Sequence, residues 1–435
     1  MRGVVAIVGR PNVGKSSLFN RIIGDRVSIT DDASGITRDR IYGKASWLNQ
    51  EFRLIDTGGI ILKDEPFSKE IRAQANLAID EADVIVMVVD VRTSVTVEDE
   101  DVMNILLRSN KPVIMAANKV DNLELVDLSY DFYSLGAAEI FPISSLHGIG
   151  IGDLLDKIIE LLPEERKDPY GEGTIKFCLI GQQNVGKSTL SNTIIGEERT
   201  IVSNIPGTTR DAIDTVFTRN GKKFVVIDTA GIRKQGKIYE NAEKYSVLRA
   251  LSAIERSDIA VLMLDGTDEL NEQDKRIAGY AREANRAIII VVNKWDIVEK
   301  DDKTMQRLTD KIKVQMPFLA FTPIIFLSAF KKERVHILLE EIEKVYENFN
   351  RRVQTSVLND VLLDAVLLNQ PPLFNGNRLR LSYATQDDVM PPSFVLFVND
   401  EKHMHFSYLR YLENKLRESF EFSGSPIKFT LRKKE

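Results

Sequence analysis

Two stretches of sequence, GRPNVGKSSLFNRIIG at residues 9–24 and GQQNVGKSTLSNTIIG at residues 181–196, decide the fold of this 435-residue chain. The second stretch begins 172 residues after the first, and Asp228 follows Asp56 at the same interval. A likeness of this length does not arise by chance, so it indicates a duplicated domain.

Each copy alternates apolar runs with longer amphipathic stretches. The apolar runs of the first copy are VVAIVG, FRLIDT, VIVMVVD and PVIMAAN. This alternation is typical of βα units on a parallel sheet. We therefore predict the α/β fold class, with a doubly wound sheet in each copy.

The punctuation of the chain predicts three domains and one linker. PEERKDPYGEG contains proline, glycine and six charges without apolar periodicity, which favours a flexible linker. Beyond the second copy, helix-like SVLNDVLLDAVLL and SYLRYLENKLRESF alternate with strand-like RLRLSY, FVLFVN and IKFTL. We place the first domain at 1–162, the charged linker at 163–174, the second domain at 175–348 and a third, compact α/β domain at 349–435.

The repeated stretch fits GxxxxGK[ST], in which glycines let backbone N–H groups surround phosphate oxygens. The lysine neutralises the β- and γ-phosphates, and the hydroxyl binds magnesium. Two matches at equivalent places make phosphate binding the strong prediction. The motif residues are Gly9, Gly14, Lys15 and Ser16 in the first copy, and Gly181, Gly186, Lys187 and Ser188 in the second.

Two further motifs of each copy are expected to meet magnesium and the γ-phosphate. FRLIDTGG and FVVIDTAG place Asp56 and Asp228 at strand ends, where they can reach the metal, while the Gly59 and Gly231 amides meet the γ-phosphate. SGITRD and PGTTRD carry the hydroxyls that we expect to close on magnesium, those of Thr37 and Thr209.

A third motif selects the base. The carboxylates of Asp121 in NKVD and Asp296 in NKWD can accept together from the ring N–H and the exocyclic amine of guanine, a donor pair that adenine lacks. GTP is therefore favoured over ATP. We expect Asn118 and Asn293 to bond the other edge of the base, Lys119 and Lys294 to cover its plane, and amides of Ser144, Ser145, Ser328 and Ala329 to reach its carbonyl oxygen.

These motifs predict two GTP-hydrolysing sites that work by positioning and electrostatics. Ile60 and Ile232 stand where Ras-like enzymes use a glutamine to orient water, so slow intrinsic turnover is expected. The residues expected to act in catalysis are Asn12, Lys15, Thr37, Asn184, Lys187 and Thr209. Val13, Ser17, Val185 and Thr189 complete the expected nucleotide contacts.

Composition limits the remaining possibilities. The net charge of −6 argues against attraction of the whole chain to nucleic acid, although it allows a local basic face. A lone cysteine, the absence of a signal-like start and the lack of about 18 consecutive apolar residues predict a cytoplasmic protein without a membrane span. Cys178 is expected to be a buried small hydrophobe.

The order GxxNVGKS, TRD, DTxG, NKxD and S-S/A, present twice and followed by LNQPPLFNGNRLRLSYATQ, resembles the EngA/Der family of bacterial GTPases over essentially the whole chain. The resemblance implies two tandem Ras-like P-loop GTPase domains, a C-terminal KH-like domain and a role in assembly of the large (50S) ribosomal subunit. It implies GTP/GDP and Mg²⁺ as ligands, the subunit or its precursor and its rRNA as partners, and a monomeric chain. Related GTPases without the glutamine use K⁺, whose expected ligands here are Asn12 and Asn184.

Some features depart from that family or leave alternatives open. The second guanine loop reads SAFKKERVH where a glycine-containing segment is usual, and the first switch reads SGITRD in place of PGTTRD. Residues 349–435 contain no GxxG loop, which true KH domains use to clamp RNA. In the helix at 407–420 the apolar spacing favours core packing over base stacking. The alternative function is a nucleotide-regulated scaffold with one structural site and a protein partner.

Overall fold

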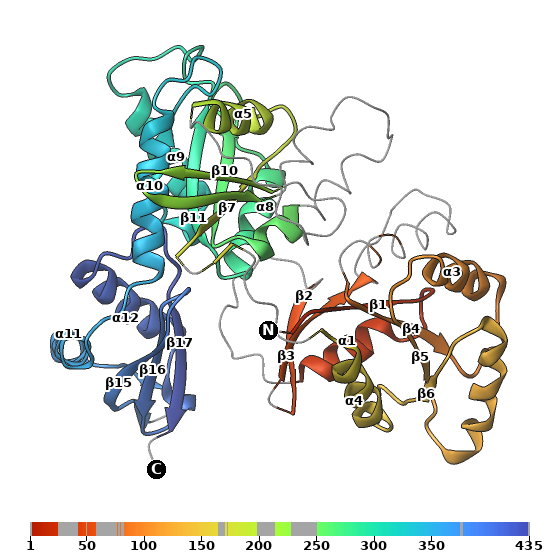
Figure 1. The fold of residues 1–435 in the computed structure, drawn as a ribbon. Helices are drawn as coiled ribbons and strands as arrows, with labels where there is room; N and C mark the ends of the chain where they lie inside the picture. Colours follow the sequence, from red (N-terminus) through yellow and green to blue (C-terminus); the bar gives the residue numbers. More distant parts are fainter. Residues whose placement is uncertain are drawn as a thin grey trace. The chain divides into compact units, whose positions relative to one another are not determined.

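The computed structural model describes residues 2–24, 42–48, 50–57, 76, 79, 82–163, 170–171, 173–197, 214–227, 250–374 and 377–433. The chain forms two compact units, Met1–Pro169 and Tyr170–Glu435 (Figure 1). Within the described ranges, no helix combines the length and the apolar character that a membrane crossing requires.

The first unit is a doubly wound α/β domain, as the alternating pattern predicts. Its six-stranded sheet has the order β2-β3-β1-β4-β5-β6, parallel except for the edge strand β2. The strands are β1 (Val4–Val8), β2 (Tyr42–Trp47), β3 (Gln50–Asp56), β4 (Val84–Asp90), β5 (Val113–Asn118) and β6 (Ile140–Pro142). The helices are α1 (Lys15–Ile23), α3 (Val97–Leu107) and α4 (Ile151–Leu161), with 3₁₀ turns η2 (Leu123–Leu125) and η3 (Asp127–Leu135).

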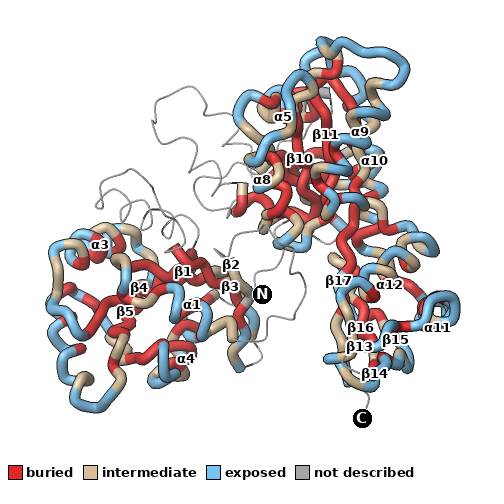
Figure 2. The backbone as a smooth tube through the Cα atoms, turned by 180° about the vertical axis from the view of Figure 1, so that it is seen from behind, coloured by how far each residue is buried: buried red, intermediate tan, exposed pale blue. Residues whose placement is uncertain are grey.

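Both faces of this sheet are covered. One buried cluster joins the sheet to α1 and α4, and another joins its opposite face to α3 and η3. The strand β4 is therefore buried along its whole length (Figure 2). A parallel strand that is covered on both faces must be apolar throughout, which explains the unbroken run VIVMVV.

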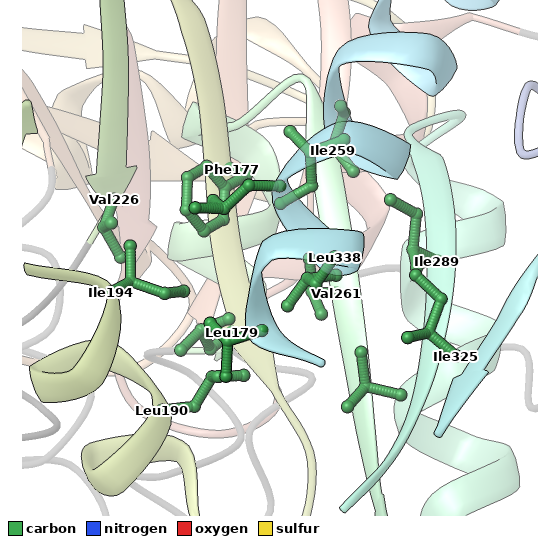
Figure 3. Close-up of a cluster of buried hydrophobic side chains, with 14 of the residues drawn as sticks. Phe177, Leu179, Leu190, Ile194, Val226, Ile259, Val261, Ile289, Ile325 and Leu338 are labelled. Carbon is green, nitrogen blue, oxygen red and sulfur yellow. The ribbon is translucent and has the colours of Figure 1, made fainter. Parts of the chain in front are cut away.

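The second copy repeats this topology. Its sheet order is β12-β11-β10-β7-β9-β8, with β8 as the antiparallel edge. The strands are β7 (Ile175–Ile180), β8 (Thr215–Arg219), β9 (Lys222–Ile227), β10 (Ile259–Asp265), β11 (Ala287–Asn293) and β12 (Ile324–Phe326). The helices are α5 (Lys187–Glu197), α8 (Glu272–Glu283), α9 (Thr304–Gln315) and α10 (Val335–Phe349), with the 3₁₀ turn η4 (Pro317–Leu319). Figure 3 shows Leu190, Ile194 and Leu338 packing on the sheet residues Phe177 and Val261.

The C-terminal region is the predicted third α/β fold. Its sheet consists of β15 (Leu381–Asp388), β16 (Ser393–Val398) and β17 (Lys428–Lys433), with β15 antiparallel and β17 parallel to β16. The other elements are α11 (Thr355–Leu368), β13 (Leu373–Phe374), β14 (Asn377–Arg378), η5 (Glu401–His403) and α12 (Phe406–Ser419). Tyr408, Leu412 and Leu416 of α12 are buried with α11 and the sheet, so core packing is confirmed for this helix face.

The second copy and the C-terminal region share a continuous contact within their unit. The helix α10 runs from the second copy to the C-terminal region (Figure 1). Gly424, in the loop between α12 and β17, accepts a hydrogen bond from the Ile288 amide (2.8 Å) and donates one to the Phe321 carbonyl (2.9 Å). Arg417 of α12 lies over the Phe321 ring, 4.5 Å from its centroid. Backbone of the C-terminal region is thus bonded directly to β11 of the second copy.

The structure differs from the sequence prediction at one end of the linker. The side chain of Tyr170 is buried in the core of the second copy, and its carbonyl accepts from Thr174 (2.9 Å) and Lys223 (2.8 Å). A single buried aromatic among charged residues gives no periodicity, which is why the sequence pattern missed it. Tyr170 and Thr174 therefore belong to the second unit.

Candidate active sites

The two phosphate loops have the same backbone conformation. Each loop joins a central strand, β1 or β7, to the helix α1 or α5. Left-handed bends at equivalent positions turn successive N–H groups to one side of the loop, an arrangement that binds phosphate. The φ angles are 154°, 66° and 100° at Gly9, Asn12 and Gly14, and 141°, 63° and 99° at Gly181, Asn184 and Gly186.

Close packing accounts for the glycine that precedes each lysine. A Cβ atom at Gly14 would overlap the side-chain amide of Asn118, and one at Gly186 would overlap that of Asn293. Both residues also have φ angles that glycine tolerates best. The glycines of GxxxxGK[ST] thus bring the loop against the strand that carries NKxD.

The loop lysines lie inside their loops. Lys15 Nζ donates to the carbonyls of Gly9 (2.7 Å) and Arg10 (2.8 Å), and the side chain is 6% exposed. Lys187 Nζ donates in the same way to the carbonyls of Gly181 (2.8 Å) and Gln182. Each ammonium group is therefore held beside the backbone amides that would surround a phosphate.

Burial gives the second site a pH dependence. Desolvation lowers the pKa of the Lys187 ammonium to about 8, whereas a bound phosphate would stabilise its protonated form. Phosphate binding must then take up a proton wherever the free lysine is partly neutral. We expect GDP binding to a Lys15→Ala chain to take up about half a proton near pH 8 and close to none near pH 7.

Calorimetry at each pH in two buffers of different ionisation enthalpy measures this proton uptake. A difference between the buffers at about pH 8 that vanishes at about pH 7 is the expected result. Equal heats in both buffers at about pH 8 would show that Lys187 is already fully protonated in the free site.

The asparagines of NKxD connect the loops of each site. Asn118 Nδ2 donates to the Val13 carbonyl (2.8 Å), and its Oδ1 accepts from the amide (3.0 Å) and hydroxyl (2.9 Å) of Ser145. Asn293 makes the matching bonds to the Val185 carbonyl (2.7 Å) and from the Ala329 amide (2.9 Å). Each amide therefore joins the phosphate loop to the guanine loop.

The groups that we expect to contact the guanine base bond within the protein in this structure, so their contacts with the base stay predictions. The Ser145 and Ala329 amides donate to asparagine side chains, while those of Ser144 and Ser328 donate to the carbonyls of Ile149 (3.0 Å) and Glu333 (3.1 Å). A bond from any of these amides to the guanine carbonyl oxygen would have to share or replace a bond of the structure. The predicted base contacts of Asn118 and Asn293 likewise would add to their bonds within the protein.

Sequence reasoning missed two residues, the aspartates that end β4 and β10. Asp90 accepts from Lys119 Nζ (2.6 Å), and Asp265 forms the same ion pair with Lys294 (2.5 Å). Lys119 Nζ also donates to the Asn12 carbonyl (2.8 Å), which links NKxD to the phosphate loop. The signal was available in the sequence, because each aspartate ends a buried apolar run at the same place in its copy.

The two carboxylates predicted to select guanine are held by serine hydroxyls. The Ser144 hydroxyl donates to Asp121 Oδ1 (2.6 Å), and Oδ2 of the same carboxylate pairs with Arg92. In the second copy a hydrogen bond from Ser328 lowers the pKa of Asp296, which keeps this carboxylate ionised at neutral pH. Both groups are therefore fixed acceptors at the ends of β5 and β11.

The expected metal ligands are only partly within the described residues. Asp56 ends β3 and is paired with Ile7 of β1, so its backbone lies near the start of the phosphate loop, and the residue is 3% exposed. One carboxylate and one hydroxyl beside a triphosphate suit Mg²⁺, which usually keeps phosphate oxygens and water as its other ligands. The hydroxyl residues Ser16, Ser17, Ser188 and Thr189 lie in the first turns of α1 and α5. The residues Thr37, Gly59, Ile60, Thr209, Asp228, Gly231 and Ile232 lie outside the described residues.

The unusual guanine loop of the second copy keeps the backbone of the first. Lys332 and Arg334 have φ angles of 60° and 62°, where Gly148 and Gly150 have 77° and 69°. An isolated bridge closes each loop at the same place. Left-handed conformations cost non-glycine residues about 1 kcal/mol or more each, so the second loop retains its shape at the expense of stability.

Comparison with protein-family models supports the reading of all three regions. A model described as "50S ribosome-binding GTPase" matches residues 4–119 and 176–294. A model described as "KH-domain-like of EngA bacterial GTPase enzymes, C-terminal" matches residues 352–432. The matched segments cover both phosphate loops and the C-terminal sheet.

Full-length relatives are similar along the whole chain. A protein of Bacillus cytotoxicus named "GTPase Der" is 58% identical over 432 residues, which cover 99% of each chain. Proteins of the same name from Geobacillus sp. and Halalkalibacterium halodurans are 59% and 57% identical, and each alignment covers 99% of this chain and 98% or 99% of the relative.

Proposed function

The chain belongs to the EngA/Der family of GTPases, and from that premise we propose that it hydrolyses GTP at both copies and acts in maturation of the large (50S) ribosomal subunit. The observation that carries the two-site proposal is the repetition of one geometry. Both copies have the same loop bends, the same lysine donating to the loop carbonyls and the same asparagine between the loops.

In the proposed mechanism each copy positions the nucleotide and neutralises its charge. The backbone amides of the loop and the ammonium of Lys15 or Lys187 bind the β- and γ-phosphates. A carboxylate and hydroxyls, from Ser16, Thr37 and Asp56 or from Ser188, Thr209 and Asp228, would hold Mg²⁺, which would supply charge stabilisation at the phosphates. The Gly59 and Gly231 amides meet the γ-phosphate. Asp121 and Asp296 select guanine through its two adjacent donors.

We further propose that K⁺ stimulates turnover, with Asn12 and Asn184 among its ligands. Both side chains are exposed on the loop, and Ile60 and Ile232 cannot orient water. A monovalent cation near the phosphates would supply positive charge where it develops. The expected result is faster hydrolysis in potassium than in sodium salts at equal ionic strength, measured as phosphate release. Equal rates in the two salts would contradict the potassium role.

The proposed targets are the large subunit or its precursor and the rRNA within it, with the chain acting as a cytoplasmic monomer. Family membership and the match to the family model "50S ribosome-binding GTPase" support this assignment. The loops around Thr37 and Thr209 would change order with the γ-phosphate and so alter the surface that meets RNA. The KH-like region would bind without a GxxG loop, or the GTPase domains would make the RNA contacts.

Co-sedimentation with isolated ribosomal subunits tests this target. The full chain is mixed with large or small subunits in GDP, in a non-hydrolysable GTP analogue or without nucleotide, at one salt concentration. Retention on large subunits in one nucleotide state, and not on small subunits, is the expected result. The absence of retention in every state would favour the alternative, a nucleotide-regulated scaffold with a protein partner.

A further inference from the structure

The guanine-selecting carboxylates of the two copies have different cationic partners. In the first copy Arg92 Nη2 pairs directly with Asp121 Oδ2, although its side chain remains 54% exposed. In the second copy Lys331 lies 3.9 Å from Asp296, and Lys300 also acts on this carboxylate, through space. Lys331 corresponds to His147 of the first copy, which lies at the same distance from Asp121. The direct guanidinium contact is therefore an addition to a shared arrangement.

The backbone at this position is the same in both copies. The Arg92 amide donates to Asp90 Oδ1 (3.0 Å), and the amide of its counterpart Thr267 donates to Asp265 Oδ1 (3.0 Å). The Thr267 hydroxyl bonds the same oxygen of Asp265 (2.6 Å) and so stays on its own turn. Only the side chain decides whether this position places a cation on the carboxylate.

We propose that Arg92 is a specificity-determining residue that weakens guanine selection at the first site, so that the two sites of one chain differ in how strictly they require the exocyclic amine of guanine. This inference rests on the proposed function, in which Asp121 and Asp296 accept from guanine.

The physical reason is competition for one carboxylate. Guanine presents two donors, the ring N–H and the exocyclic amine, and the Asp121 carboxylate offers two oxygens. Ser144 uses one lone pair of Oδ1 (2.6 Å), whereas the guanidinium occupies Oδ2 and neutralises its charge. Hydrogen bonds to an ionised acceptor are the stronger ones, so a paired carboxylate gains less from guanine. Hypoxanthine, the base of IDP, lacks the exocyclic amine and so makes one bond fewer to this carboxylate. Pairing with Arg92 therefore weakens the binding of IDP less than the binding of GDP.

The test compares the binding of GDP and IDP at each site. Titrations with fluorescent derivatives of GDP and IDP use full-length chains in which the other site is disabled by Lys187→Ala or Lys15→Ala.

The reciprocal exchanges Arg92→Thr and Thr267→Arg match the natural difference between the copies. Arg92→Thr is expected to raise the ratio of GDP to IDP affinity at the first site about three- to tenfold. Thr267→Arg should lower the ratio at the second site by a similar factor.

A conservative variant separates this role from a structural one. Arg92→Lys keeps a cation beside Asp121 and should restore most of the original ratio, whereas a merely structural loss would change GDP and IDP affinity equally. A ratio that stays within about twofold in both reciprocal variants would overturn the inference. Failure of the disabled chains to bind any GDP would instead contradict the proposed function.

Discussion

Replacing Lys15 by alanine is expected to lower GTP hydrolysis at the first site by about 100-fold or more while the second site continues to turn over, and Lys187→Ala should do the reverse. The loop carbonyls hold the ammonium group, which in the proposed mechanism neutralises the β- and γ-phosphates, so its loss would remove a fixed positive charge there. Removal of one such charge-stabilising donor typically costs about 10²- to 10³-fold in rate.

Phosphate release under saturating GTP measures the effect for each single variant and for the double variant. Lys157→Ala and Lys222→Ala are matched controls, because these lysines form ion pairs with glutamates away from the loops. Each single variant should keep part of the total rate, and the double variant should keep almost none. Loss of all turnover in one single variant and none in the other would support the scaffold with one structural site.

A second large effect is expected where the C-terminal region meets the second copy. Gly424 has a φ angle of 73°, and a Cβ atom there would lie 2.6 Å from Val345 Cγ2 and 3.2 Å from the Ile288 carbonyl oxygen. Gly424→Ala should therefore add overpacking of about 1–3 kcal/mol to about 1 kcal/mol of backbone strain. Because the clash falls on α10 and β11, the second copy and the C-terminal region should lose stability together.

Gly221 provides the matched control, since its φ angle is 77° and no heavy atom lies within 4 Å of its ideal Cβ position. Gly221→Ala should cost only the strain of about 1 kcal/mol. Thermal unfolding followed by calorimetry compares the two variants. Equal decreases in the unfolding temperature would mean that the close approach at Gly424 relaxes without cost, and that the contact with Val345 is not a tight one.

The sequence predicts the local elements of this protein better than the contacts between distant segments. The phosphate loop is local, because the bends at Gly9, Asn12 and Gly14 and the helix that follows all lie within one motif. Its fold could be predicted from spacing, and the duplicated motif made the prediction strong. The third domain could also be predicted, since α12 buries the residues whose spacing is helical, Tyr408, Leu412 and Leu416.

Contacts between distant segments could not be predicted in this way. Asn118 bonds the Val13 carbonyl across 105 residues, and spacing does not show which polar group a side chain will meet. The pairing of Arg92 with Asp121 depends on two loops that the sheet brings together. Local backbone conformation was also unpredictable in the guanine loop of the second copy. Lys332 and Arg334 adopt left-handed backbone angles there, for which the sequence gives no signal. There the packing of the domain outweighs local preference.

The number of guanine nucleotides bound per chain shows whether both copies bind nucleotide. Equilibrium dialysis with GDP on the full chain, followed by the same measurement on Asp121→Ala and Asp296→Ala, counts the working sites. We expect two GDP molecules per wild-type chain and one in each variant at a concentration that saturates the intact site. A single GDP per wild-type chain, lost in one variant and unchanged in the other, would contradict this expectation.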